Sequence, residues 1–502
     1  MILRNPLLSH VQPVRFLKTS QVEHDNQTFN SEYQKPLVIL MSNILSVLSC
    51  LILFGCHTSK QSIDTGNTIR LSWDQKQNRS LATIAFGIPA INKTEISYKV
   101  NGNISLNILL GEPRIIVVAD TPQPWGYYQF PTISRLADGS LHAEWSLHAD
   151  AIQSYGTSSV GSAISKDGGN TWQPGIPDSS QLTGYKLVNG DMIKVVDPKP
   201  VKVSDLKMPE AFAKTNFKYR KTNFTFYRLK DMPPGTNGVY ISRMVKGQHK
   251  WNLEQASLDD PNALRYSSKD LVPVVWWGDI HTIKDSSLVA GIYPGYYIKD
   301  NGEPDKQMGV VFYRSTDNAL SWKFQSRIPF TPDKTIDSMS TDRIGFSEPA
   351  YEVLADGSLL CVIRSADGDG VTNGVGNGPL YASISKDMGV TWTKPAVIAP
   401  AGALPRLLHL KNGIKVLSSG RPGVQLRFSK TGLNDSWTDP VEMLPYESDS
   451  MQELYLVSCG YTGLLATGPN RFLIIYSDFK YKNQANEIRK AIKIREVIVD
   501  PG

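Results

Sequence analysis

The sequence predicts an all-β fold, a six- or seven-bladed β-propeller, on three observations. Its 39 glycines and 31 prolines in 502 residues favour many short strands joined by turns. A turn of the form Ser-x-Asp-x-Gly-x-Thr-Trp recurs along the chain. A hairpin in which Asp-Gly or Asn-Gly precedes an alternating strand recurs as well. Such repetition is typical of a propeller, whose blades are four-stranded sheets, whereas stacked sandwiches would not explain the repeated turn.

The recurring turn is built from residues whose chemistry suits a tight hairpin. Its Asp can accept hydrogen bonds from its own backbone, its Gly can adopt a positive φ, and its Trp can fill the gap beneath. The turn reads SAISKDGGNTW at 162–172 and ASISKDMGVTW at 382–392, with weaker copies at 313–322 and 427–437. The strands that follow a Gly hairpin lie at 136–145, 354–364, 410–421 and, loosely, 468–478.

The N-terminal residues predict the cellular location of the protein rather than part of its fold. Residues 1–35 match neither a signal nor a folded segment, so they are unstructured or precede the true start. Residues 36–56 are apolar and end in LFGC, which resembles a bacterial lipoprotein signal with Cys56 as the lipidated residue; a membrane anchor or a buried helix is the alternative. Residues 57–72 would tether a catalytic propeller at 73–502. This resemblance implies export to the bacterial cell envelope, with the protein lipid-anchored to the outer membrane or facing the periplasm.

Composition excludes several functions. The formal net charge is +6 and no long run of Lys or Arg occurs, which does not fit nucleic-acid binding. Of the four cysteines, Cys361 and Cys459 lie in strand-like segments where a buried free thiol is expected. The sequence contains no disulfide framework, no conventional metal-ligand spacing, no phosphate-binding loop and no dinucleotide fingerprint. It therefore predicts neither a metal nor a cofactor.

One strand carries an unusual polar face. Between Leu141 and Asp150 apolar and polar residues alternate, which predicts a strand with one buried face. Its polar positions include His142, Glu144, His148 and Asp150. Imidazoles and carboxylates are the groups that general acid–base chemistry uses, whereas a solvated strand face usually carries Lys, Thr or Ser. Structural roles are the alternative, with the histidines packed between blades and Glu144 paired with an arginine of the next blade.

The Ser-x-Asp-x-Gly-x-Thr-Trp turn is similar to the Asp-box of the sialidase-like propellers, which the chain resembles over nearly its whole mature length. Members carry a Glu sixteen residues before an Arg across an Asp-Gly hairpin, and SEPAYEVLADGSLLCVIR places Glu348 and Arg364 at that spacing. They also carry a Tyr at the start of a late blade, here Tyr461. The resemblance implies that Tyr461 is a nucleophile activated by Glu348. It also implies a further substrate-binding arginine, Arg421 or the nearby Arg427.

Two departures from the family pattern favour a different chemistry. Where the family places an arginine that grips the substrate carboxylate, the segment YYQFP has Gln129. Losing that arginine removes charge-assisted hydrogen bonds of about 1.5–3 kcal/mol each. Where the family places an Asp general acid, the segment SLHAD offers both His148 and Asp150.

A pocket with histidine, arginine and tyrosine fits β-elimination from a uronic acid. In that reaction a cation neutralises the carboxylate, a base such as His takes the C5 proton, and an acid such as Tyr protonates the leaving oxygen. His142 or His148, Arg364 and Tyr461 match these roles without a metal. Propeller polysaccharide lyases that cleave ulvan resemble this description. With water as the leaving group, the same residues would make an oligosaccharide dehydratase.

Residues 274–297 add candidate substrate-binding groups. Trp277, Asp279, His281 and Tyr293 lie in a segment rich in aromatic and polar residues. Aromatic rings next to polar groups suit the faces of sugars, while packing between blades is the structural alternative. His281 is in addition an alternative catalytic base.

The sequence therefore predicts a carbohydrate-active enzyme that acts on acidic, uronic-acid-containing glycans, ulvan among them, by β-elimination as a lyase or dehydratase. A sialidase-like exo-glycoside hydrolase that uses Tyr461 and Glu348 is the alternative, and a non-catalytic glycan-binding propeller is a further one. The expected partners are an acidic glycan and, through the N-terminal anchor, the bacterial membrane, but not nucleic acid.

Overall fold

The computed structural model describes residues 69–72, 94–100, 103–157, 159–217, 222–305, 307–366, 378–432, 436–445 and 457–501. The predicted segments 1–35 and 36–56, with Cys56, lie outside these residues, as does most of the predicted tether. Within the described part of the chain, regular structure is almost entirely strand, with a few short 3-10 helices. No helix there is long and apolar enough to cross a membrane.

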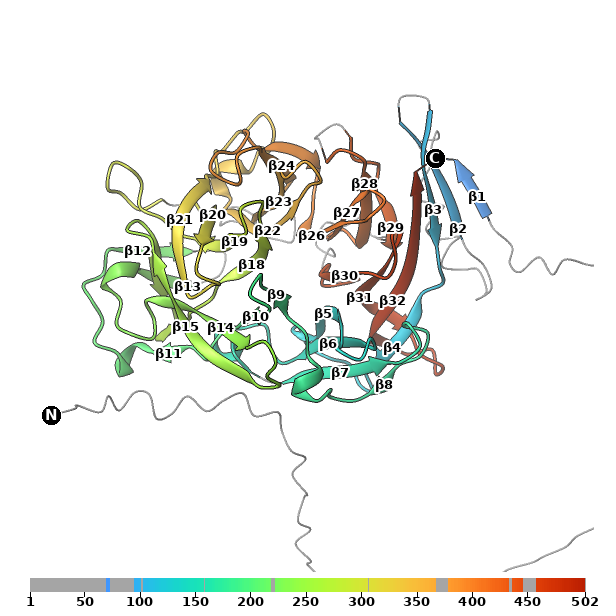
Figure 1. The fold of residues 1–502 in the computed structure, drawn as a ribbon, viewed down its shortest axis with the longest axis horizontal. Helices are drawn as coiled ribbons and strands as arrows, with labels where there is room; N and C mark the ends of the chain where they lie inside the picture. The colour runs from blue at the N-terminus through green and yellow to red at the C-terminus, as the bar shows by residue number, and fades with distance from the viewer. Residues whose placement is uncertain are drawn as a thin grey trace, which may run out of the picture. The chain divides into compact units, whose positions relative to one another are not determined.

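The strands form four-stranded antiparallel meanders (Figure 1). The first joins β5 (Tyr127–Arg135), β6 (Leu141–Leu147), β7 (Val160–Ser165) and β8 (Gln173–Pro174). The second joins β9 (Tyr185–Lys186), β10 (Met192–Val195), β14 (Gly238–Met244) and β15 (Trp251–Asp259). The third joins β18 (Trp277–Thr282), β19 (Leu288–Gly295), β20 (Gly309–Ser315) and β21 (Ser321–Ile328), and its outer strand β21 also pairs with β15.

The later meanders repeat this pattern. The fourth joins β22 (Gly345–Val353), β23 (Leu359–Ala366), β24 (Leu380–Ser385) and β25 (Ala396–Ala399). The fifth joins β26 (Ala403–His409), β27 (Lys415–Gly420), β28 (Val424–Ser429) and β29 (Val441–Leu444). The sixth joins β30 (Thr462–Ala466), β31 (Arg471–Lys482) and β32 (Ile488–Pro501) to β4 (Arg114–Val118), so it combines strands from both ends of the described sequence.

The remaining strands extend or flank the meanders. β32 also pairs with β3 (Asn103–Leu110), which continues to β2 (Thr94–Val100) and β1 (Ile69–Ser72). The last four residues of the predicted tether therefore form a strand. Insertions form two small sheets, β11 (Val201–Lys202) with β17 (Leu271–Val272), and β12 (Ala213–Phe217) with β13 (Thr222–Arg228) and β16 (Leu264–Ser267).

The first strand of each meander lies nearest the middle of the sheets in Figure 1. β22 packs against β18 and β26, and β30 packs against β26 and β5. Meanders arranged side by side around their first strands are the architecture of a β-propeller. The predicted fold class, an all-β propeller, is thereby confirmed.

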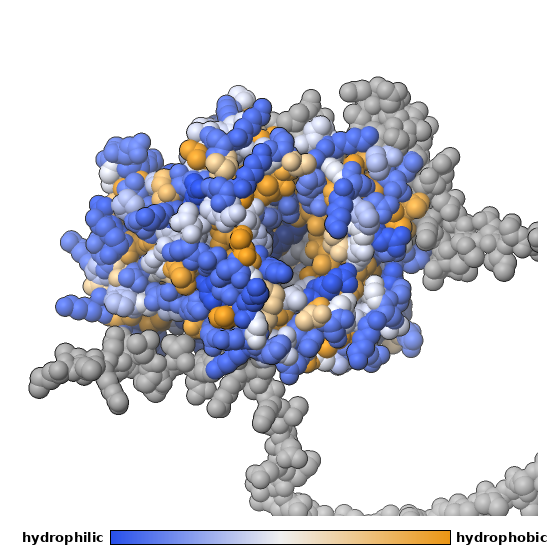
Figure 2. All heavy atoms as spheres, in the orientation of Figure 1, coloured by the Kyte–Doolittle hydropathy of each residue, from blue (hydrophilic) through white to orange (hydrophobic). Residues whose placement is uncertain are grey.

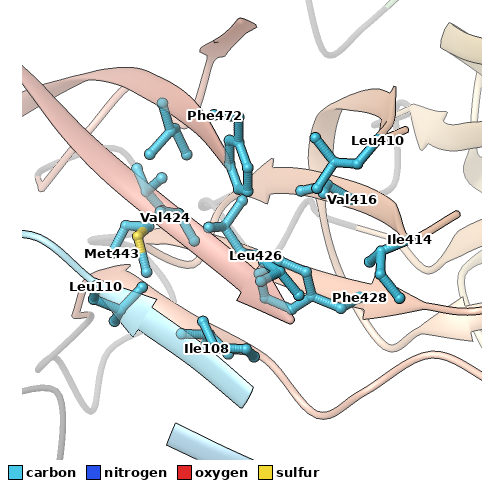
Figure 3. Close-up of a cluster of buried hydrophobic side chains, with 14 of the residues drawn as sticks. Ile108, Leu110, Leu410, Ile414, Val416, Val424, Leu426, Phe428, Met443 and Phe472 are labelled. Atoms are coloured by element: carbon cyan, nitrogen blue, oxygen red, sulfur yellow. The ribbon is translucent and has the colours of Figure 1, made fainter. Parts of the chain in front are cut away.

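Apolar side chains hold neighbouring meanders together. One cluster joins the fifth and sixth meanders to β3, with Phe428, Phe472 and Ile108 fully buried (Figure 3). Other clusters lie between the second and third, the third and fourth, the fourth and fifth, and the first and sixth meanders. In this arrangement every residue of β23 and of β27 is buried, so both faces of these strands are packed, which fits the Leu, Val and Ile residues of β23.

The repeated turns connect the third and fourth strands of their meanders, as the sequence predicts for a hairpin. In one, Asp167 accepts hydrogen bonds from the backbone nitrogens of Asn170 and Thr171 at 3.0 and 2.9 Å. In another, Asp387 accepts from the Thr391 backbone at 2.8 Å, and Gly389 has a φ of 85°. These bonds satisfy backbone donors that the turn would otherwise leave unpaired.

Candidate active site

Four predicted residues meet at the ends of inner strands. Glu348 lies on β22, Arg364 lies opposite on β23, Arg421 directly follows β27, and Tyr461 directly precedes β30. The pairing of β22 with β23 shifts register between Ser347 and Ala350, and Glu348 has a φ of 48°. A bulge with a residue in this conformation turns a side chain away from the regular alternation. In this case it brings the Glu348 carboxylate to Arg364.

The Glu348 carboxylate is the centre of the group. Nη1 of Arg364 donates to both carboxylate oxygens at 3.0 Å. The backbone nitrogen of Leu404 donates to Oε2 at 2.8 Å, and the hydroxyl of Tyr461 donates to Oε1. Glu348 is 6% exposed, so these donors replace the water that a surface carboxylate would bind.

The buried charges act on one another. Burial alone would raise the pKa of Glu348, but the Arg364 guanidinium, the Tyr461 hydroxyl and Arg421 together hold that pKa below its usual value. Burial, followed by the Glu348 charge, raises the pKa of the Tyr461 phenol well above its usual value. Tyr461 is therefore a neutral phenol whose proton faces an ionised carboxylate.

Arg421 completes the group from the other side of the tyrosine. Its guanidinium lies 5.2 Å from the centre of the Tyr461 ring, and its Nε donates to the Cys459 carbonyl at 2.9 Å. The ring of Phe130 lies 5.0 Å from the Tyr461 ring. Arg427, the alternative arginine, donates instead to the Thr438 carbonyl at 2.9 Å within its own meander. The structure therefore places Arg421 beside the tyrosine.

Gln129 is fully buried. When its amide is oriented by its neighbours, the oxygen accepts from Lys490 Nζ and from the Gly126 backbone, both at 3.1 Å. Lys490 Nζ also donates to the Pro124 carbonyl at 2.7 Å. Gln129 thus holds a half-buried lysine and a loop, which is a different use of this position from the arginine that the family pattern places there.

His142 and Glu144 lie between the first and second meanders. His142 is 2% exposed, and its Nε2 lies 2.8 Å from Ser162 Oγ, whose hydroxyl in turn donates to the Gly175 carbonyl. Burial, with a contribution from Lys194, lowers the pKa of His142 to about 4. The imidazole is therefore neutral near pH 7. Within the described residues, no hydrogen bond of His142 connects it to Tyr461. This position differs from the one that the expected catalytic role requires.

The end of the same strand lies nearer the surface. His148 is half-buried, and its Nδ1 lies 2.9 Å from the carbonyl oxygen of Ala149. Asp150 is exposed, and its Oδ2 accepts a hydrogen bond from the indole nitrogen of Trp125 at 2.9 Å. The Trp125 ring lies 5.7 Å from the Arg421 guanidinium. Of the two acids considered for this position, Asp150 is connected to the tyrosine group by direct contacts, by way of Trp125 and Arg421.

An aromatic wall adjoins the tyrosine group. The Trp277 ring lies 5.3 Å from the ring of Tyr293 and 5.2 Å from that of Tyr155. Burial, then the charges of Glu348 and Tyr461, raise the pKa of Tyr293 well above its usual value, so Tyr293 lies within electrostatic reach of the reactive group. The indole of Trp277 donates to Asp197 at 2.5 Å, and burial raises the pKa of that carboxyl to about 6.

Asp279 and His281 belong to a second polar group on the inner strands. Asp279 accepts from the Tyr351 backbone at 3.2 Å and lies 3.8 Å from an Arg406 nitrogen. The His281 ring lies 4.6 Å from the Tyr351 ring, and burial lowers its pKa. Burial, reinforced by Asp279, raises the pKa of Glu352 to about 8. Figure 2 shows a hollow near the middle of the sheets with hydrophilic atoms inside it.

Glu352→Gln should make the protein more stable in alkaline solution. The folded-state pKa of about 8 lies above the usual value of 4.5. Below pH 4.5 the carboxyl is protonated in both the folded and the unfolded protein and costs no stability, and the free energy of unfolding falls as pH rises from 4.5 through 8. We expect the free energy of unfolding of the wild type to fall by about 3 kcal/mol more than that of the variant between pH 5 and pH 9. Chemical denaturation at both pH values measures this difference.

The exposed Glu210 provides the matched control for this prediction. Glu210→Gln removes the same charge from the surface and should leave the pH dependence of unfolding unchanged. Equal pH dependence in wild type and Glu352→Gln would show that Glu352 is not held in its neutral form.

The sequence matches no protein-family model, and comparison with curated proteins finds no match. Several solved structures are similar. A Dyadobacter fermentans protein of unknown function is 15% identical with a TM-score of 0.45, over 77% of this chain and 99% of that one. A mutant of the NanB sialidase of Streptococcus pneumoniae is 14% identical with a TM-score of 0.38, over 77% of this chain and 70% of that one.

A third similar structure is the α-L-arabinofuranosidase Arb93A of Fusarium graminearum, at 16% identity and a TM-score of 0.39, over 76% of this chain and 96% of that one. These identities are all far below the level at which shared activity follows from similarity. The likeness concerns the fold alone, so the function has to be argued from the residues of the site.

Proposed function

We propose that this protein is a glycoside hydrolase that removes an acidic sugar from a glycan, with Tyr461 as the nucleophile. The hydrogen bond from the Tyr461 hydroxyl to the buried Glu348 carboxylate, between two arginines, is the observation that carries the proposal. An adjacent base within hydrogen-bond reach is what turns a neutral hydroxyl into a nucleophile.

Charge explains the choice of a tyrosine. Arg364 and Arg421 bring two positive charges to a group that contains one carboxylate, Glu348, so the site favours an anionic sugar. A carboxylate nucleophile would repel the carboxylate of such a sugar at close range, whereas a neutral phenol does not. The high pKa of Tyr461 keeps the phenol neutral until reaction begins.

The reaction then proceeds in two displacements. The Tyr461 oxygen attacks the anomeric carbon while its proton passes to Glu348, the bond to the leaving oxygen breaks, and Asp150 protonates that oxygen. In the second step Asp150 takes a proton from water, and the water oxygen attacks the anomeric carbon. Glu348 returns its proton to the tyrosine as the glycosyl–tyrosine bond breaks. Two displacements leave the configuration of the sugar unchanged.

The aromatic wall suits the rest of the substrate. Trp277, Tyr293 and Tyr155 are half-buried and lie side by side next to the reactive group. Rings in such a position stack on the C–H faces of a sugar. Asp197 behind them receives a hydrogen bond from the same tryptophan and keeps its ring in place.

β-Elimination from a uronic acid is the second candidate. Tyr461 beside Arg421 supplies a phenol and a cation, two of the groups that elimination requires. The histidine base of that reaction is weakly supported, because His142 bonds to Ser162 and the His148 imidazole lies against the Ala149 carbonyl. Hydrolysis by a tyrosine and a glutamate needs no such base.

The products decide between these functions. We expect glycosides of sialic and uronic acids to release free acidic sugar with retained configuration, incorporating oxygen from isotopically labelled water. The matched neutral glycosides should react at least about tenfold more slowly, because they lack the charge-assisted bonds to arginine. Mass spectrometry and proton NMR of the first product measure both properties. An unsaturated product without the label would overturn hydrolysis in favour of elimination, and binding without any product would indicate a glycan-binding propeller.

A further inference from the structure

The loop that precedes β5 packs directly on the end of the polar strand. Gly126 has a φ of 99°, and a Cβ there would lie 2.3 Å from the His148 carbonyl oxygen and 2.5 Å from the Asp150 backbone nitrogen. Only glycine fits such a position, both for its conformation and for the space available. The backbone of the loop is therefore fixed against Asp150.

This loop presents Trp125 to two residues of the proposed reaction. The indole nitrogen donates to Oδ2 of Asp150 at 2.9 Å, and the ring lies 5.7 Å from the Arg421 guanidinium. Arg421 in turn lies over the Tyr461 ring. The Phe479 ring also contacts Trp125, perpendicular to it and with the two ring centres 6.3 Å apart.

A half-buried lysine, Lys490, anchors the same loop. Nζ of Lys490 donates to the carbonyls of Pro124 at 2.7 Å and Tyr127 at 3.2 Å, on either side of Trp125. Its ammonium group also lies 4.4 Å from the Phe479 ring. The carbonyls flanking the tryptophan are thus bound to one side chain of β32, which limits the positions that the indole can take.

We infer that Trp125 is a positioning residue that aims the Asp150 carboxyl group at the leaving oxygen while packing against Arg421. This inference rests on the proposed hydrolysis. An exposed carboxylate samples several rotamers, and the N–H of an indole that itself contacts Arg421 holds Asp150 in one of them. A misplacement of about 1 Å in a catalytic group can cost about 100-fold in rate.

Trp125→Phe tests the inference, because it keeps a ring beside Arg421 and removes the N–H. The measurement compares two glycosides of the same acidic sugar, one with a nitrophenol leaving group, which departs without a proton, and one with an alkyl or sugar leaving group, which needs the acid. We expect kcat/KM, which reports on the first displacement, to fall by about 10- to 100-fold for the alkyl glycoside. For the nitrophenyl glycoside kcat/KM should change by less than about threefold.

Two further variants make this result specific. Asp150→Asn should show the same dependence on the leaving group, and adding Trp125→Phe to it should cause no further loss, because the tryptophan acts through the aspartate. Trp251→Phe removes an indole that donates to the Ser179 carbonyl at 3.1 Å in the second meander, and it should affect neither substrate.

Equal losses on both substrates, or losses that add to those of Asp150→Asn, would overturn the role assigned to Trp125 while leaving hydrolysis intact. Failure of the wild type to release sugar from either glycoside would instead overturn the proposed function, and the positioning role with it. Circular dichroism of each variant confirms that a loss of rate is not a loss of fold.

Discussion

Tyr461→Phe should lower kcat for glycoside hydrolysis by at least about 10³-fold while the protein stays folded, because removing a nucleophile abolishes the covalent route. The phenylalanine keeps the packing against Phe130 and loses only the hydroxyl that donates to Glu348. The two arginines that would bind the substrate carboxylate and the aromatic wall are unchanged, so substrate binding should persist. Steady-state kinetics and calorimetric titration with the substrate measure the two effects separately.

Tyr476→Phe is the matched control for that prediction. Tyr476 is fully buried in the cluster between the fifth and sixth meanders, and its hydroxyl makes no hydrogen bond within the described residues. Its replacement removes the same atom from a different place and should leave kcat unchanged. If Tyr461→Phe retained more than about a tenth of the wild-type kcat, the tyrosine could not be the nucleophile.

The fold was predictable because its signals are local. The Asp-containing turns at Asp167 and Asp387 bond their own backbone, so a few consecutive residues contain the whole reason for the hairpin. Their recurrence indicates repeated sheets, and repeated sheets of this size indicate a propeller. The closure of the sixth meander by β4 depends on pairing between residues more than 370 positions apart, and no local pattern predicts it.

The reactive group was predictable in its residues but not in its geometry. Spacing and resemblance indicate Glu348, Arg364, Tyr461 and Arg421, and the structure brings all four together. The register shift and the positive φ that turn Glu348 towards Arg364 are properties of two paired strands, which one strand's sequence does not contain.

The surroundings of the site were beyond the sequence for a different reason. Alternation along a strand predicts which side chains share a face, but not which neighbouring sheet that face meets. The sequence therefore indicates His142 as a catalytic group, whereas its imidazole bonds to Ser162 on the neighbouring strand β7 of the first meander. Trp125, Asp197 and Lys490 lie in loops or on outer strands with no pattern to mark them, and their contacts join segments that are distant in sequence.

Arg364→Met should destabilise the fold by about 3 kcal/mol or more, because it leaves the buried Glu348 carboxylate without the partner that binds both of its oxygens. Methionine has a similar length and fills the space, so the loss reports on charge rather than on a cavity. Without the guanidinium, burial should raise the Glu348 pKa above its usual value, so the variant should regain stability as pH falls, when the carboxyl binds a proton. The free energy of unfolding at pH 5 and pH 8 measures both effects.

The double variant Glu348→Gln with Arg364→Met tests whether the loss comes from an unpaired charge. The oxygen of a neutral amide can still accept from the Leu404 backbone while its nitrogen donates to the Tyr461 hydroxyl oxygen, so the double variant should recover most of the stability lost in Arg364→Met. The pH dependence that Arg364→Met adds to that of the wild type should disappear, because the carboxyl group that causes it is gone. A double variant as unstable as Arg364→Met would mean that the arginine stabilises the protein through packing. The ion pair between Arg364 and Glu348 would then contribute to the reaction but not to stability. Since both variants disturb the base that activates Tyr461, stability rather than activity is the quantity that separates these two explanations.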